Sequence, residues 1–312
     1  APSPVAAPVV ENIVTDAGLS LWLVRSPSLP LAILQFACHG GASRDPGGAE
    51  GASHLLADLL TEGAGSLDSA AFHEALADRA IQIGFSTSAD AFYGWSYSLA
   101  RHRDEAFRLL KLALHEPRLD PSAIERSAGE ILAGIRHGLR SPDTRCETAF
   151  YAEAFPDHPY GRRVKGTTET IPAITRTQLL GQREPLLYRK GLKLVLVADM
   201  EAGEAARLVD GVFAGLPEGD DAPAAPATIA GLGTTRLIEM DVPQTTIRFG
   251  APGVALDDPD YYAAAVVNHI LGGSAFTSRL FQEVREKRGL AYGVWSSLAP
   301  MRSAAIHYGG TA

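Results

Sequence analysis

Residues 36–63 read FACHGGASRDPGGAEGASHLLADLLTEG, and residues 249–273 read FGAPGVALDDPDYYAAAVVNHILGG. Three residues of the first stretch recur 213 positions later in the second, namely Phe36, Asp45 and Pro46. A pattern that returns at a fixed distance along a chain predicts two units of the same fold. We therefore expect two domains of similar structure, and the residues around the first stretch indicate what each one contains.

These surrounding residues follow strand and helix patterns. Two strand-length apolar runs, 19–25 and 31–38, flank the turn-like segment SPSLP, which predicts a hairpin. Apolar residues at helical spacing predict a helix over 52–60, with Ser53 near its start as a possible cap. Trp95 and Tyr97 alternate on a later predicted strand and are expected in the core. The same reasoning predicts further helices over 69–81, 104–115, 121–139 and 201–216, and strands within 82–99 and over 191–199.

The best candidate for a linker is the Ala- and Pro-rich stretch 220–226. We expect a first domain at 1–218, a linker at 219–230 and a second domain at 231–312. The second copy of the pattern stops where the first has reached about residue 100, so we expect the second domain to be incomplete in this chain. Its sheet would then keep an uncovered apolar face, which either further residues or another polypeptide would cover.

Composition excludes several classes of partner. The 312 residues are 46% hydrophobic, which is enough for a full core. The net charge is -8, and Lys and Arg are scattered, so we expect no nucleic-acid partner and no binding to an anionic membrane surface. The longest apolar runs, such as 192–198, have the length of a strand, and we expect no membrane span.

The chain begins with the small, Pro-rich stretch APSPVAAP, which is typical of residues just after a removed signal peptide. We therefore expect a periplasmic or secreted protein, while a cytoplasmic location stays open as the alternative. The chain has two cysteines, Cys38 and Cys146. Cys38 falls in an apolar run and is expected to be a buried thiol, although a disulfide between the two is not excluded.

Residues 271–292, LGGSAFTSRLFQEVREKRGLAY, are similar over their whole length to the second-domain signature of the pitrilysin family of zinc metallopeptidases. Supporting matches in the expected order are GGASRDP at 40–46, LTEGAG at 60–65 and FPDHPYG at 155–161. The resemblance covers nearly the whole chain. It implies an α+β fold of two homologous domains, each a mostly antiparallel sheet with helices packed on one face.

The family's zinc motif is the inverted H-x-x-E-H, and this chain reads HLLAD at the matching residues 54–58. His54 is present, but Ala57 replaces the Glu that acts as general base, and Asp58 replaces the second zinc-binding His. Glu130, 76 residues after His54, matches the family's third ligand, a Glu on a later helix. The chain thus resembles a peptidase with a degenerate active site.

Two interpretations of the surviving residues stay open. His54, Asp58 and Glu130 could form a metal site of one His and two carboxylates. Alternatively, His54 and Glu130 are a hydrogen-bonded pair between helices and no metal binds. In either case Ala57 has no ionisable group, so we expect the chain to be inactive alone.

The second-domain signature is intact, in contrast to the zinc motif. The resemblance implies that Arg285 and Tyr292 are the Arg and Tyr that reach the active site, where they bind substrate and stabilise the oxyanion. By residue type alone they could be a solvated helix residue and a strand aromatic. Gly272 and Gly273 end a predicted helix or, alternatively, form a flexible loop that contacts substrate.

The combination of a lost zinc motif and a retained Arg/Tyr pair favours a zinc-less subunit of a heteromeric peptidase. Its partner would be a homologous subunit that carries H-x-x-E-H and the zinc ion, this chain would hold no cofactor, and the substrate would be a peptide. One alternative is a non-enzymatic peptide-binding or assembly scaffold. Another is a self-sufficient metallopeptidase that uses the variant site at His54, Asp58 and Glu130.

Overall fold

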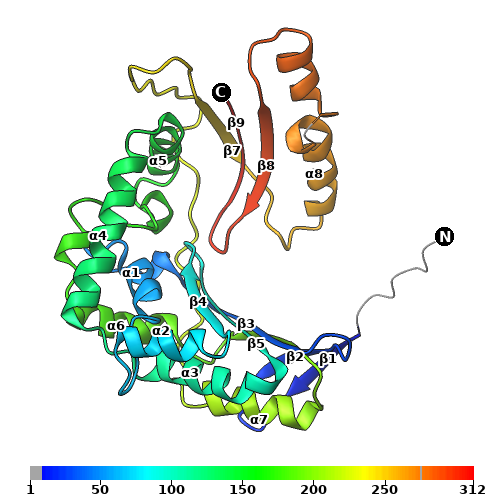
Figure 1. The fold of residues 1–312 in the computed structure, drawn as a ribbon. Coiled ribbons are helices and arrows are strands. Elements are labelled where there is room, and N and C mark those ends of the chain that lie inside the picture. The colour runs from blue at the N-terminus through cyan, green and yellow to red at the C-terminus, as the bar shows by residue number, and fades with distance from the viewer. Residues whose placement is uncertain (1–8, 275) are drawn as a thin grey trace. The chain divides into compact units, whose positions relative to one another are not determined.

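The structure is a computed structural model that describes residues 9–274 and 276–312 (Figure 1). Residues 1–8, on which the expectation of export rests, lie outside the described residues. The chain divides into two compact units, Ala1–Leu132 with Val164–Ala222 and Ala133–Arg163 with Pro223–Ala312. The predicted linker 219–230 spans the last of these divisions, and residues 133–163 cluster with the second unit.

The first unit is built on a six-stranded sheet with the order β1-β2-β6-β3-β5-β4. Only β2 and β6 run parallel, and the other neighbours are antiparallel, which confirms a mostly antiparallel sheet. The strands are β1 Val10–Val14, β2 Ser20–Arg25, β3 Leu31–His39, β4 Gln82–Thr87, β5 Ala91–Leu99 and β6 Lys193–Ala198.

The predicted hairpin between the strands now labelled β2 and β3 is wrong, because β6 lies between them. β6 has the sequence KLVLVA, is apolar along most of its length and pairs on both sides, as an interior strand does. The five residues that join β2 to β3 are long enough to cross one intervening strand, since neighbouring strands lie about 4.8 Å apart. The hairpin partner of β2 is β1 instead.

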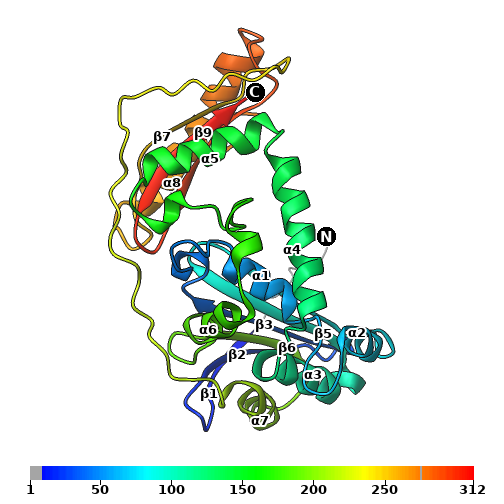
Figure 2. The same cartoon turned by 90° about the vertical axis from the view of Figure 1, so that its left-hand side faces the viewer.

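Helices cover one face of this sheet, as predicted (Figure 2). Along β3, Leu34 and Phe36 are buried on the helical side, while Gln35 between them is exposed. The ring of Phe36 packs edge-on against Phe213 of α7, with 5.0 Å between centroids. The helices of this unit are α1 Ala52–Leu59, α2 Ser69–Ala77, α3 Arg103–His115, α6 Arg176–Leu186 and α7 Ala202–Phe213, and α4 Pro121–Gly138 continues across the division at Leu132.

The second unit repeats part of the first. Its strands β7 Ile247–Pro252, β8 Val294–Pro300 and β9 Ala305–Thr311 form an antiparallel sheet with the order β7-β9-β8. This order matches β3-β5-β4, and α8 Tyr261–Asn268 follows β7 as α1 follows β3. The internal repeat is thereby confirmed. The unit also contains α5 Pro142–Ala154 and two π-helical turns, η5 His269–Gly273 and η6 Phe281–Glu286.

The second unit exposes apolar residues that the first unit buries. Phe249 of β7 is 40% exposed, whereas its counterpart Phe36 is 4% exposed. Val266 and Val267 of α8 are also largely exposed. The expected uncovered apolar face is therefore present on the described residues of this unit. None of the helices in the described part of the chain combines the length and apolar character needed to cross a bilayer.

Candidate functional site

Helix α1, which carries the degenerate motif, is held at its start by Asp45. The Asp45 carboxylate accepts hydrogen bonds from the backbone N–H groups of Gly51, at 2.8 Å, and Ser53, at 2.9 Å. The Ser53 hydroxyl and the Gln182 amide also donate to Asp45. Asp45, and not Ser53 as predicted, is thus the side chain that caps the helix. Burial raises the pKa of the Asp45 carboxyl, although the hydrogen bonds from Ser53 and Gly51 oppose that shift.

The motif residues themselves have different environments. His54 is half-buried, Ala57 is buried at 2% exposure, and Asp58 lies at the surface one turn after His54. Burial lowers the pKa of His54, and the charge of Lys165 lowers it further, while Asp58 opposes the shift. Burial raises the pKa of Asp58, and His54 and Lys165 oppose that change. His54 is therefore held as a neutral imidazole near neutral pH.

Glu130 is exposed on α4, and its charge contributes to raising the pKa of Asp58. No hydrogen bond joins Glu130 to His54 among the described residues, so the predicted interhelical pair is not formed. Residues 9–274 and 276–312 also contain no group of three or more His, Cys, Asp or Glu side chains placed to hold a metal ion. The set His54, Asp58 and Glu130 is thus not gathered as a zinc site, and the residues present do not fit the metal.

No displaced carboxylate takes over from Ala57. Glu62, three residues after the end of α1 at Leu59, accepts a hydrogen bond from Ser69 at 2.6 Å and pairs with Arg126. Burial alone would raise the pKa of Glu62, but Ser69 and the charge of Arg126 lower it below its ordinary range. A carboxylate with a lowered pKa is a weak base, and the contacts with Ser69 and Arg126 hold this one in place.

Arg285 and Tyr292, expected as a pair, are brought together by the structure. Arg285 lies in η6, and its guanidinium carbon is 4.6 Å from the centroid of the Tyr292 ring and 4.8 Å from that of Phe281. Phe281 is buried and anchors the turn, while Tyr292 is 79% exposed. Among the described residues, the Tyr292 hydroxyl has no hydrogen-bond partner. The pair thus offers a phenol donor and a guanidinium side by side at the surface.

Gly272 has a structural role that the sequence left open. It is buried, and a Cβ atom at this position would lie 2.5 Å from the Ser296 Oγ and 2.7 Å from the Ser296 backbone nitrogen. The Ser296 hydroxyl in turn donates to the side-chain oxygen of Asn268 at 2.8 Å. Only glycine lets the turn approach β8 this closely. A substrate-contacting role for Gly272 and Gly273 stays a prediction.

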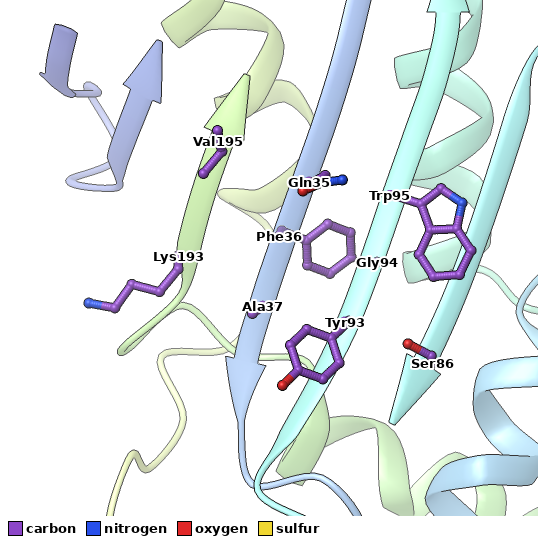
Figure 3. Close-up of a pocket in the computed structure, with 9 residues that line it drawn as sticks. All are labelled: Gln35, Phe36, Ala37, Ser86, Tyr93, Gly94, Trp95, Lys193 and Val195. Carbon is purple, nitrogen blue, oxygen red and sulfur yellow. The ribbon is translucent and has the colours of Figure 1, made fainter. Parts of the chain in front are cut away.

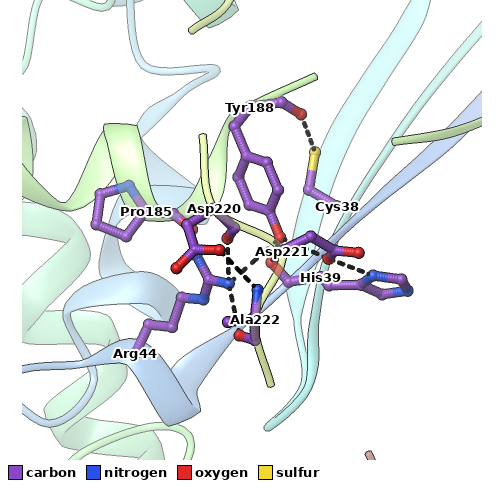
Figure 4. Close-up of polar contacts among 8 residues, drawn as sticks. All are labelled: Cys38, His39, Arg44, Pro185, Tyr188, Asp220, Asp221 and Ala222. Atoms are coloured by element: carbon purple, nitrogen blue, oxygen red, sulfur yellow. Dashed lines mark hydrogen bonds and ion pairs between the residues drawn. The ribbon is translucent and has the colours of Figure 1, made fainter. Parts of the chain in front are cut away.

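Sequence reasoning missed a cluster around Arg44, a residue inside the matched stretch 40–46 (Figure 4). The Arg44 guanidinium donates to the carbonyl oxygens of Pro185, at 2.9 Å, and Asp220, at 2.7 Å. It also lies over the ring of Tyr188, 5.1 Å from the centroid. The carboxylate of Asp221 pairs with His39 Nδ1 at 2.7 Å. These contacts fix residues 220–222 on the first unit.

Both cysteines are free thiols. The Cys38 thiol is buried and donates to the backbone carbonyl of Tyr188 at 3.7 Å. Burial raises the pKa of Cys38 to about 12. The prediction of a buried thiol at Cys38 is confirmed. Cys38 and Cys146 form no disulfide with each other in this structure.

Comparisons with known proteins agree with this architecture. Residues 173–310 match a family model described as the peptidase M16 inactive domain. A Helicobacter pylori protein named as a non-peptidase homolog is 26% identical over 291 residues, which is 93% of this chain and 67% of the relative. An uncharacterized zinc protease of Streptomyces coelicolor is 27% identical over 299 residues, which is 92% of this chain and 64% of the relative.

Solved structures extend the likeness to the whole fold. A crystal structure described as a peptidase M16 inactive domain from Pseudomonas fluorescens superposes with a TM-score of 0.87 and 28% identity, over 97% of this chain and 74% of that one. Pitrilysin itself matches with a TM-score of 0.77 and 18% identity, over 99% of this chain and 34% of that one, which shows the shared fold. The chain is therefore pitrilysin-like, with the fold of the M16 peptidases, a match to the M16 inactive domain at residues 173–310, and no zinc motif in its first unit.

Proposed function

We propose that this chain is the zinc-less subunit of a heteromeric pitrilysin-type peptidase and that it contributes Arg285 and Tyr292 to a partner's active site. The partner is a homologous chain that carries H-x-x-E-H, the zinc ion and the general base, and the substrate is a peptide. The similarity to proteins named as inactive or non-peptidase supports the loss of activity in this chain alone.

The observation that carries the proposal is the stacking of Arg285 on Tyr292. Arg285 is itself placed by Phe281, because the guanidinium lies over both rings. A cation over an aromatic ring contributes about 0.5–1 kcal/mol at an exposed site, which is enough to favour one ring orientation. The exposed phenol, which has no hydrogen-bond partner among residues 9–274 and 276–312, is thereby held as a donor for another molecule.

The two groups suit the transition state of peptide hydrolysis. When water attacks a peptide carbonyl, its oxygen gains negative charge, and a phenol O–H placed in advance can donate a hydrogen bond to it. The guanidinium has five donors and can hold a neighbouring substrate carbonyl or carboxylate. Its positive charge, close to the Tyr292 ring, also stabilises the negative charge that develops on the carbonyl oxygen.

The same chain cannot supply the other half of the reaction. Ala57 carries no group that accepts a proton, and removal of a general base lowers the rate on the order of 100- to 10,000-fold. His54 has no second histidine one turn on, because Asp58 occupies that position. In this proposal the partner supplies the metal and the base.

Reconstitution tests the proposal. The chain and a homologue with intact H-x-x-E-H are assayed separately and mixed, with a quenched fluorescent peptide as substrate. We expect the mixture to cleave at least about tenfold faster than the sum of the separate chains. A homologue that is fully active alone and is not stimulated by this chain would contradict the proposal and favour the scaffold role.

A further inference from the structure

A row of paired residues aligns the sheets of the two units. Trp95 and Tyr97 lie on the other face of β5 from this row, where Trp95 lines a hollow of about 310 Å³ (Figure 3). Both are half-buried, so the prediction that they lie in the core is wrong. The rows are Phe36, Gly94 and Phe85 across β3-β5-β4, and Phe249, Gly309 and Ser296 across β7-β9-β8.

The two units differ at one place in these sheets. In the first unit, Phe85 of β4 and Phe92 of β5 are buried, and their rings stack with 6.1 Å between centroids. The same register places Ser296 of β8 and His307 of β9 at the corresponding positions of the second unit. A stack of two apolar rings in one repeat is therefore a pair of polar side chains in the other.

Asn268, the last residue of α8, joins these two polar side chains. Its side-chain oxygen accepts a hydrogen bond from the Ser296 hydroxyl at 2.8 Å and lies 3.0 Å from Nε2 of His307. Its side-chain nitrogen donates to the backbone carbonyl of Ser296 at 3.3 Å. The amide oxygen thus faces two donors, which places the proton of a neutral His307 on Nε2. Directional bonds of this kind specify one arrangement of a helix on a sheet more sharply than stacked rings do.

The bonds between Asn268 and Ser296 close the base of a long excursion of the chain. The two residues are 28 positions apart, and the turns η5 and η6 lie between them, together with Arg285 and Tyr292. Asn268 directly precedes η5, and Ser296 lies on the strand that begins just after Tyr292. The base therefore fixes the helix end before the Arg285–Tyr292 pair and the strand after it.

Packing extends this constraint from the base to the pair. Gly272 lies so close to its neighbours that a Cβ atom would be 2.5 Å from Oγ of Ser296 and 2.9 Å from Cδ1 of Leu280. The residue after Leu280 is Phe281, whose buried ring lies 4.8 Å from the guanidinium carbon of Arg285. A shift of Asn268 against β8 would thus displace the ring on which the guanidinium rests.

We propose that Asn268 is a positioning residue for the Arg285–Tyr292 pair, and that Ser296 and His307 hold its amide in the orientation that this requires. The effect on peptide cleavage rests on the proposed function, because it needs the pair to act in a partner's active site. The placement of the pair does not, and it can be measured in this chain alone.

NMR of the 312-residue chain, labelled with ¹³C-arginine, measures that placement. Aromatic rings move the resonances of protons above their faces upfield, so the Cδ protons of Arg285 report its stacking, and those of the exposed Arg279 give a reference. Asn268→Leu keeps the volume and loses all three contacts, and we expect it to move the Arg285 resonance toward that of Arg279. Asn12→Leu, which removes one exposed hydrogen bond from Ser20 in the first unit, is the control and should leave it unchanged.

Two variants of His307 separate hydrogen bonding from packing, and they decide the question if Asn268→Leu does not fold. The amide nitrogen of His307→Gln can donate to Asn268 as the imidazole does, whereas His307→Leu has no donor. We expect the Arg285 resonance to stay in place with the first variant and to move with the second. Circular dichroism spectra equal to that of the unmodified chain show that each variant is folded.

The mixed subunits give the second readout. Asn268→Leu should lower kcat by about tenfold and change KM less than about twofold, because a displaced oxyanion donor weakens binding of the transition state and not of the substrate. His307→Gln should recover most of the rate that His307→Leu loses.

Two results would overturn the proposal. The first is an Arg285 resonance that Asn268→Leu and His307→Leu leave in place in the folded chain. The second is an equal displacement by His307→Gln and His307→Leu, since packing and not the hydrogen bond would then hold the pair. If the resonance moves as expected but the mixture with the unmodified chain does not cleave peptide, the proposed function fails and the positioning role of Asn268 stands.

Discussion

The guanidinium of Arg285 lies over the ring of Tyr292, with 4.6 Å between its central carbon and the ring centroid. The two residues are seven positions apart, in a π-helical turn and just before a strand, and no regular element alone would make them neighbours. Phe281 completes the arrangement from inside the fold, because its buried ring lies under the same guanidinium. The retained half of the degenerate site is thus a preformed unit and not two separate side chains.

Arg285→Ala should lower the activity of the mixed subunits by about 100-fold, because the phenol loses its fixed position as well as its neighbouring charge. The initial rate of peptide cleavage in the reconstituted mixture measures this effect. Arg279→Ala, at an exposed arginine of the same stretch, is the control and should change the rate less than about twofold. Equal losses of rate in both variants would mean that the overall positive charge of this stretch, and not the stacked pair, determines the rate.

Asp45→Ala should destabilise α1 by about 2–3 kcal/mol, because two backbone N–H groups lose their acceptor and the buried Ser53 and Gln182 side chains lose a partner. Hydrogen exchange of the α1 amides measures the free energy of opening. Asp258→Ala, the counterpart in the repeat, removes one exposed contact to the Asp260 N–H and should cost less than about 1 kcal/mol. Similar costs at both positions would refute the capping role of Asp45.

Cys38 should resist alkylation in the folded protein. Its pKa of about 12 leaves roughly 10⁻⁴ of the thiol ionised at pH 8, and only the thiolate reacts. Cys146, which is partly exposed, should therefore be labelled first by iodoacetamide at pH 8, as mass spectrometry of peptides would show. The Cys38 rate should rise about tenfold per pH unit up to its pKa while the fold persists. Fast labelling of Cys38, or a disulfide in the non-reduced protein, would contradict the structure.

The purified chain should hold less than about a tenth of an equivalent of zinc after incubation with excess metal and desalting. The physical reason is that Asp58 and Glu130 do not gather with His54 around one point. Elemental analysis measures this, and the double variant Ala57→Glu with Asp58→His, which restores the motif, should bind more zinc than the unmodified chain. One full equivalent of bound zinc in the unmodified chain would support the alternative of a self-sufficient metallopeptidase.

Elements with a strong local pattern could be predicted from the sequence. The apolar run at 191–199 and the helical spacing at 104–115 correspond to β6 and α3, with ends that differ by one or two residues. Helix α6 was not predicted, because it has few apolar residues at helical spacing and contains Pro185. The position of β6 between β2 and β3 was predicted wrongly, because strand pairing depends on burial of both faces and not on the nearest turn.

The site shows the same division between local and non-local information. The loss of the zinc motif at Ala57 and Asp58 can be seen in the sequence, and the resemblance to a known family singled out Arg285 and Tyr292. The cap at Asp45 was not predicted, because Asp45 lies outside the helix whose Gly51 and Ser53 N–H groups it accepts from. The Arg44 cluster was not predicted, because its partners Pro185 and Asp220 lie more than a hundred residues away. Contacts at that separation depend on the sheet order, which the sequence pattern alone did not provide.

The central claim is that Tyr292 completes the active site of a partner. The most direct measurement is kcat of peptide cleavage by the mixed subunits with Tyr292→Phe in this chain, beside Tyr262→Phe as an equally exposed tyrosine of the same unit. We predict a loss of about 100-fold in kcat for Tyr292→Phe, since one oxyanion donor is removed, and no loss for Tyr262→Phe. An unchanged kcat with Tyr292→Phe would contradict the account.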